Sequence, residues 1–102
     1  MKNDLIIQLH KNFEEYAHQA DGEEFWFARD LQGLLGYSKW ENFARVIDKA
    51  KTACQTAGHT VADHFPDVRK MVDIGSGAER PVEDIALTRY ACYLIAQNGW
   101  SR

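Results

Sequence analysis

The stretch that decides the fold reads Trp26-Phe27-Ala28-Arg29-Asp30-Leu31-Gln32-Gly33-Leu34-Leu35-Gly36-Tyr37-Ser38. It opens inside an aromatic run that begins at Phe25, and such residues favour a short, half-buried strand. Leu31, Leu34 and Leu35 follow at the i, i+3 and i+4 spacing of one helix face. Gly36 predicts the end of that helix, because glycine takes the left-handed C-terminal conformation without a steric penalty.

A second helix is expected to begin almost at once. Ser38 followed by Glu41 matches a capping box, which predicts Ser38 as the residue that caps this helix. Apolar residues then recur at helical spacing from about Lys39 to Ala57, with Trp40, Phe43, Ile47, Ala50 and Cys54 facing inward. Two helices joined by so short a turn must cross, which is the geometry of many helix-turn-helix modules.

The rest of the chain predicts a small α+β domain of order α-β-α-α-β-β-α, in which helices pack on one side of a three-stranded sheet. Residues 61–67 are expected to form a short helical turn, and Pro81 favours a sheet edge. The remaining elements follow from apolar periodicity and turn residues: helices over Asn3–Ala20 and Thr88–Asn98, and a hairpin of Arg69–Ile74 and Arg80–Ile85 around a turn at Gly75–Ala78.

Composition limits the class of protein. A length of 102 residues fits one domain, 1–102, and a hydrophobic content of 45% suits a packed core. The formal net charge is −3, whereas dedicated DNA-binding domains are usually basic. No apolar run reaches the ~20 residues of a membrane span and no signal peptide is recognised, so a cytoplasmic protein is expected. Cys54 and Cys92 are then expected to be reduced and buried.

Several stretches together resemble a known family. The opening stretch is joined by Gly58-His59, Asp63-His64-Phe65, Lys70-Met71-Val72-Asp73-Ile74-Gly75-Ser76 and the run from Asp84 to Gly99. In this order and spacing they resemble the N-terminal module of the bacterial DNA-damage-inducible protein D family and, more distantly, the BRO-N domain of phage and viral antirepressor-like proteins. The resemblance covers about residues 24–99. The family usually continues from Asn-Gly into Asp-Pro and a long helical remainder, whereas Trp100-Ser101-Arg102 follows here.

The leading candidate for a binding surface is a polar stripe on the helix after Ser38. It consists of Lys39, Asn42, Arg45 and Lys49, opposite the apolar face. Asparagine can contact a base edge and the cations can contact phosphates. Arg29 lies next to the turn and would add to this surface. The alternative is an ordinary solvated helix face, because Glu41 and Arg45 form an i, i+4 pair in the favourable order.

The second candidate is the hairpin tip, with Arg69, Lys70 and Arg80 on its flanks. A wing-like hairpin can reach a DNA groove or backbone. Its glycines also suit a plain turn, and the plain turn is the favoured explanation.

Catalytic and metal sites are not expected, and no cofactor motif is present. Cys54, His59 and His64 lack the second cysteine of a zinc site. Cys92 lies in an apolar helix, where a thiolate is disfavoured. Trp26 and Trp40 fit core positions better than exposed stacking positions.

Two functions remain open. The first is a non-enzymatic, nucleic-acid-associated regulatory module of the DNA-damage response, a context that the resemblance alone implies. The second is a protein-interaction module that binds a repressor or recombination protein, which the acidic net charge favours. The last helix carries more apolar surface than one buried stripe needs, namely Leu87, Tyr90, Ala91, Tyr93, Leu94 and Ile95, with Trp100 beyond it. This surplus predicts a homodimer through that helix, unless the helix is central and enclosed.

Overall fold

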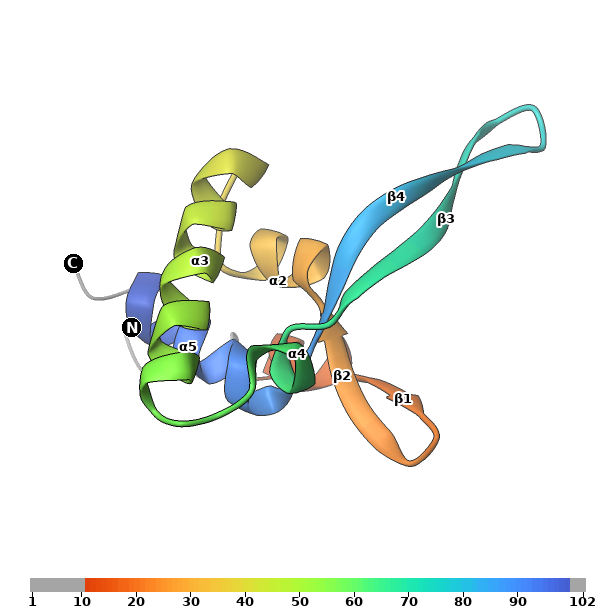
Figure 1. Ribbon diagram of the computed structural model, residues 1–102. Helices are drawn as coiled ribbons and strands as arrows, with labels where there is room; N and C mark the ends of the chain where they lie inside the picture. Colours follow the sequence, from red (N-terminus) through yellow and green to blue (C-terminus); the bar gives the residue numbers. More distant parts are fainter. Residues whose placement is uncertain (1–10, 100–102) are drawn as a thin grey trace.

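The computed structural model describes residues 11–99 and has α+β architecture, as predicted (Figure 1). Its four strands form one antiparallel sheet in the order β1-β2-β4-β3, one strand more than expected. Residues 11–15 are helical. The elements that follow are β1 (His18–Ala20), β2 (Glu23–Phe27), α2 (Ala28–Leu34), α3 (Trp40–Thr56), α4 (Val61–His64), β3 (Asp67–Gly75), β4 (Ala78–Leu87) and α5 (Arg89–Gly99). Trp100 lies outside the described residues.

The additional strand, β1, corrects the predicted first helix. That helix was expected to reach Ala20, but helical backbone ends at residue 15 and His18–Ala20 pairs with β2. Residues 3–10 of the prediction lie outside the described part of the chain. Asp21 and Gly22 have φ values of 53° and 80°, the two positive angles of a type I′ hairpin turn. The dipeptide therefore closes a hairpin rather than ending a helix.

The end of α2 forms as predicted. Gly36 has a φ of 81°. Its N–H donates to the Gly33 carbonyl at 3.1 Å, and the Tyr37 N–H donates to the Gln32 carbonyl at 3.0 Å. This pair of bonds is the Schellman motif, which satisfies carbonyls that the helix end leaves without a partner.

The start of α3 differs from the prediction. The helix begins at Trp40, and Lys39 is the capping residue, with extended backbone and no side-chain capping bond. The expected Ser38 capping box is therefore wrong, because Ser38 lies one residue too early to reach the first-turn N–H groups. The body of α3 agrees with the prediction. Phe43, Ile47, Ala50 and Cys54 are buried, and Trp40 packs against the core from its rim.

The core lies where α3 and α5 pack together beside β2 and the end of β4. Trp26, Phe43, Leu87 and Ile95 are fully buried there. Helix α5 buries both sides of its apolar surface, including Ala91, Cys92 and Leu94, and the large side chain that it exposes is Tyr93, at 52%. This enclosure accounts for most of the apolar surplus on the last helix.

Arg89, the first residue of α5, bonds to two earlier segments of the chain. Its guanidinium donates to Glu14 at 2.7 Å and to Glu24 at 2.8 Å, and it lies 5.0 Å from the centre of the Trp26 ring. The bond from Arg89 holds the pKa of Glu24 below its ordinary value.

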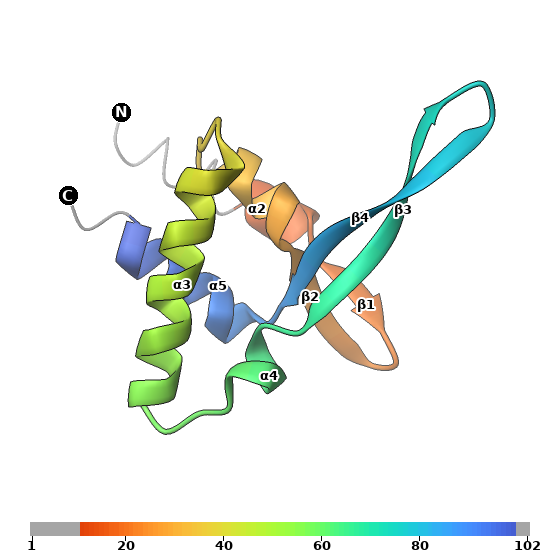
Figure 2. The ribbon, with the colours of Figure 1, turned by 45° about the horizontal axis from the view of Figure 1, so that its top comes forward.

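The β3–β4 hairpin extends away from the helical body (Figures 1 and 2). Strand β4 pairs with β2 only at Ala86 and Leu87, while its pairing with β3 continues out to the turn. Ser76 and Gly77 form that turn with φ values of 54° and 76°. Residues 73–81 are all exposed. At Pro81, β4 pairs with β3 on one side, and its pairing with β2 on the other side is confined to Ala86 and Leu87. Pro81 therefore lies at a sheet edge, as predicted. The helices therefore cover the base of the sheet and leave the hairpin uncovered.

The Schellman turn gives a matched pair of glycine variants. We expect Gly36→Val to lower the free energy of unfolding by about 2 kcal/mol, because a β-branched residue is strained at positive φ. Gly33→Ala is the control, since Gly33 lies inside α2 with nothing within 4 Å of an added Cβ. It should leave stability unchanged or raise it by up to ~1 kcal/mol. Urea unfolding of both variants measures this, and equal midpoints would contradict the turn.

Candidate nucleic-acid interface

The polar stripe on α3 is exposed along its length. Lys39, Asn42, Arg45 and Lys49 all lie at the surface, while Phe43 and Ile47 are buried on the opposite side. Successive residues of an α-helix are about 100° apart around its axis, so Asn42, Arg45 and Lys49 fall within an arc of about 60°. Arg45 Nη1 donates to Asn42 Oδ1 at 3.4 Å. Within the described residues, Glu41 makes no ion pair with Arg45, so the pair that supported a plain solvated face is not formed.

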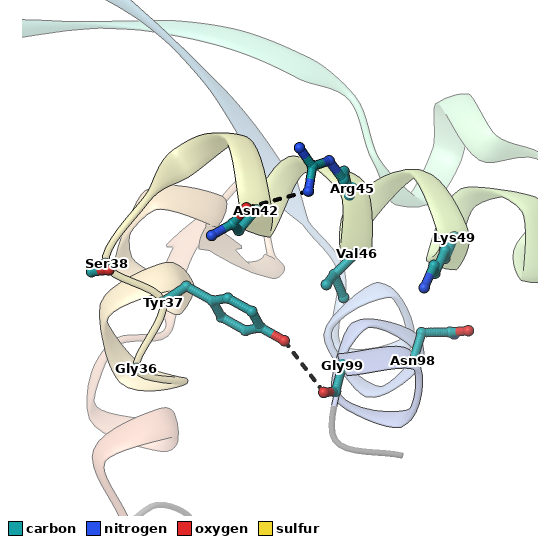
Figure 3. A pocket seen from close by; sticks show the side chains of 9 residues that line it. All are labelled: Gly36, Tyr37, Ser38, Asn42, Arg45, Val46, Lys49, Asn98 and Gly99. Carbon is teal, nitrogen blue, oxygen red and sulfur yellow. Dashed lines mark hydrogen bonds between the residues drawn. The ribbon is translucent and has the colours of Figure 1, made fainter. Parts of the chain in front are cut away.

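Three residues of the stripe, Asn42, Arg45 and Lys49, line one wall of an open groove of about 530 Å³, whereas Lys39 lies outside it. Three segments distant in sequence line it: the α2–α3 turn at Gly36, Tyr37 and Ser38, the α3 residues Asn42, Arg45, Val46 and Lys49, and the end of α5 at Asn98 and Gly99. Figure 3 shows Val46 and Lys49 directed toward the end of α5 across this space, while the guanidinium of Arg45 turns toward Asn42. None of the lining residues is acidic, although the protein carries a net negative charge.

A close approach between Tyr37 and Gly99 fixes one end of the groove. The Tyr37 hydroxyl donates to the Gly99 carbonyl at 3.4 Å (Figure 3). A Cβ added to Gly99 would lie 2.5 Å from the Tyr37 hydroxyl oxygen and 3.2 Å from Val46 Cγ1. Glycine at this position therefore lets the α2–α3 turn and the end of α5 meet beside α3.

Arg29, the fifth residue assigned to this surface, is engaged within the fold. Its Nε donates to the Glu83 carbonyl at 2.8 Å, and its guanidinium lies 4.3 Å from the centre of the Trp40 ring. Its backbone N–H donates to Asp84 Oδ1 at 3.1 Å. Arg29 thus joins α2 to β4 and to the first residue of α3.

Lys70 is also engaged within the fold, through the carboxylate of Asp84. The Asp84 residue is 2% exposed, and its Oδ2 lies 3.3 Å from Lys70 Nζ. This contact is an ion pair without hydrogen-bond geometry. Asp84 Oδ1 accepts the N–H groups of Arg29 and of Ile85. The ammonium of Lys70 also lies 4.3 Å from the centre of the Phe27 ring. The structural role of Asp84 was not predicted from the sequence. The one feature that could have indicated it is a carboxylate directly before the apolar residues that end β4.

The hairpin cations do not converge on one surface. Arg69 pairs with Glu83 directly across the strands, at 3.2 Å. Arg80 pairs in register with Val72, three residues along β3 from Arg69, so the two arginines lie on opposite faces of the hairpin. The hairpin projects to the side of the molecule away from α3 and the end of α5 (Figures 1 and 2). The helix stripe and the hairpin are therefore separate surfaces.

His59 and His64 lie at structural positions. His64 Nδ1 lies 2.8 Å from the hydroxyl of Thr88, which caps α5 by accepting the Ala91 N–H. The His59 and His64 rings both pack against Tyr90. In residues 11–99, no three His, Cys, Asp or Glu side chains are grouped closely enough to hold a metal ion.

Neither thiol is arranged for nucleophilic chemistry. Cys54 and Cys92 are both buried, and burial raises the pKa of each above its ordinary value. A thiol must ionise to attack, so these two are inert. No helix in the described part of the chain is long and apolar enough to cross a membrane.

Asp84 provides a direct test of the anchor that positions α2 and α3. Asp84→Ala leaves the Arg29 and Ile85 N–H groups without their acceptor and Lys70 without its counter-ion, so we expect a loss of about 3 kcal/mol in unfolding free energy. Asp84→Asn keeps an oxygen for the two N–H groups and should lose less than half as much. Thermal and urea unfolding measure both, and an Asn variant as unstable as the Ala variant would show that the ion pair alone matters.

Comparison with known proteins identifies the family of this chain. Residues 15–102 match the N-terminal domain of the BRO family, Bro-N. Over 91 residues the chain is 52% identical to the DNA damage-inducible protein D of Escherichia coli (strain K12). That alignment covers 88% of this chain and 33% of the E. coli protein, so the chain spans about a third of the relative. No solved structure matches the chain. With nearly the whole chain covered by the family match, this protein belongs to the BRO family, as an N-terminal domain homologous to DNA damage-inducible protein D.

Proposed function

We propose that this domain is a non-enzymatic, nucleic-acid-associated regulatory module of the DNA-damage response, which contacts DNA through the α3 stripe. Lys39, Arg45 and Lys49 contact phosphates, and Asn42 lies among them where it can meet a base edge or a sugar. The observation that carries the proposal is the groove wall itself. It gathers cations and amides with no carboxylate, in a protein whose net charge is −3.

The cellular context is drawn from the relative. DNA damage-inducible protein D is named for its induction by DNA damage, and this chain is 52% identical to it over the aligned part. In the proposed role, the domain acts at DNA or at a protein bound to DNA. A module without a catalytic group fits that role, and the two buried thiols described above supply none.

A protein-interaction module is the second candidate. Its specific support is the uncovered hairpin, where Met71 and Ile74 are 56% and 57% exposed. Glu41 and Asp48 also border the α3 stripe and would weaken its attraction for phosphates. Under this alternative, the partner is a second copy of the chain, bound through Tyr93 of α5, or else a repressor or recombination protein. Binding of this kind buries apolar surface and depends little on salt, unlike phosphate contact.

Two charge-matched double variants separate the surfaces. We expect Arg45→Glu with Lys49→Glu to abolish binding to a short DNA duplex, because two phosphate contacts become repulsions. The parent should lose affinity steeply as salt rises, because each phosphate contact adds about 0.9 to the slope of log affinity against log salt. Both side chains lie off the buried face of α3, so the fold should survive. Fluorescence anisotropy at two salt concentrations measures the binding.

The control carries the same change of charge on the hairpin, as Arg69→Glu with Arg80→Glu. It should bind the duplex within about threefold of the parent, since only the overall repulsion changes. If the hairpin variant loses binding and the helix variant keeps it, the α3 stripe is not the interface. If the parent binds no nucleic acid at low salt, the protein-interaction module replaces the proposal.

A further inference from the structure

The groove beside α3 has two chemically different walls. Arg45 and Lys49 stand one helical turn apart on the α3 wall, and side chains at this spacing can reach one common group. Asn42 belongs to the same wall. Its carboxamide oxygen accepts from Arg45, and its NH₂ group remains to donate to a ligand. The α3 wall is therefore made of donors and positive charge.

The opposite wall is made largely of acceptors. It comes from the last turn of α5, where Asn98 and Gly99 line the groove. The Gly99 carbonyl accepts the Tyr37 hydroxyl at 3.4 Å and keeps a second lone pair. The Asn98 NH₂ donates to the Leu94 carbonyl at 2.8 Å, which leaves the carboxamide oxygen as its acceptor. An anion is favoured at α3 and hydrogen-bond donors are favoured at α5.

The charges also bear on which anion the α3 wall suits. A phosphodiester carries one negative charge, whereas a phosphomonoester carries about −1.5 to −2 at neutral pH. The two cations of the α3 wall match the monoester, and no lining carboxylate reduces their charge. The volume of about 530 Å³ falls within the range of about 300–1,000 Å³ that small-ligand sites occupy.

We infer that the groove binds a nucleotide through a terminal 5′-phosphate. The phosphate lies against Arg45 and Lys49, and the sugar and base point their hydroxyl and N–H groups toward Asn98 and Gly99. Two sources offer this chemistry, a free nucleoside monophosphate and the 5′-phosphorylated end of a DNA strand. The inference rests on the proposed function in one respect, since both require Arg45 and Lys49 to contact a phosphate.

The first experiment titrates the protein with thymidine 5′-monophosphate and follows backbone amide signals by NMR. We expect shifts on both walls, at Ser38 and Arg45 and also at Gly99. Thymidine, which lacks the phosphate, should cause none at the same concentration. Shifts confined to α3 and equal to those caused by inorganic phosphate would overturn the inference, because the second wall would then play no part.

The second experiment distinguishes the two sources. Oligothymidylate with a 5′-phosphate is compared with the same strand ending in a 5′-hydroxyl. A gain of about tenfold for the phosphorylated strand assigns the site to a DNA end. Binding of the monophosphate without such a gain assigns it to a free nucleotide. If the monophosphate gives no shifts and the 5′-phosphate gives no gain, the inference fails.

Ser38 supplies a matched pair of variants outside the α3 stripe. Ser38 is an exposed residue at the rim of the groove, and its side chain makes no capping bond. Ser38→Glu brings a carboxylate to the groove and should weaken monophosphate binding about tenfold, whereas Ser38→Gln has nearly the same size and should change it by about twofold or less. A carboxylate just before α3 is compatible with the helix dipole, so the fold should hold. Parental affinity in the Glu variant would overturn the inference.

The same probes keep this inference apart from the proposed function. A duplex with 5′-hydroxyl ends tests backbone contact alone. If that duplex binds with a steep salt dependence while the monophosphate and the 5′-phosphate have no effect, the inference fails and the proposed function stands. If the monophosphate binds and the 5′-hydroxyl duplex does not, the reverse holds.

Discussion

The Asp84 carboxylate joins the β3–β4 hairpin to α2, and the position of α3 beside the groove depends on this contact through Arg29. From β4, one of its oxygens accepts the second N–H of α2, whose capping residue Phe27 supplies no side-chain bond. The other oxygen is paired with Lys70 of β3. A buried carboxylate is costly unless it is paired and hydrogen-bonded, so Asp84 constrains all three elements together. Arg29 then carries the constraint to α3 by packing over Trp40.

This anchoring explains why the basic residues of the chain have different roles. Arg29 and Lys70 hold elements together, and Arg89 does the same at the start of α5. The cations of α3 lie beyond these contacts, on a wall that is completed by the α2–α3 turn and the end of α5 (Figure 3). An acidic protein can in this way present a local surface without carboxylates. Local charge, rather than net charge, governs contact with a phosphate.

Much of the fold is predictable because its signals are local. The leucine spacing and Gly36 define α2 and its end, and Gly75-Ser76-Gly77 marks the hairpin turn. The strand β1 is missed because Asp21-Gly22 suits both a helix stop and a type I′ turn, and only its pairing with β2 decides between them. The Ser38 cap fails because one residue of extended backbone at Lys39 moves the helix start.

The site is less predictable than the fold, because its parts come from distant segments. The stripe follows from the helical period, but the groove needs Tyr37 and Gly99 to meet, 62 residues apart. The roles of Arg29 and Lys70 depend on Asp84, which lies 55 residues from Arg29. From the sequence, all eight residues predicted to contact nucleic acid look equivalent. Composition does not indicate which of them bond to other residues within the fold.

The central claim is that ligands meet this domain at the α3 wall and not at the projecting hairpin. Amide NMR spectra of the isotope-labelled protein with a short DNA duplex test it most directly. The account predicts shifts that centre on Asn42, Arg45 and Lys49, with the hairpin turn at Ser76 and Gly77 unchanged. Shifts that centre on the hairpin turn, with α3 unchanged, would contradict it.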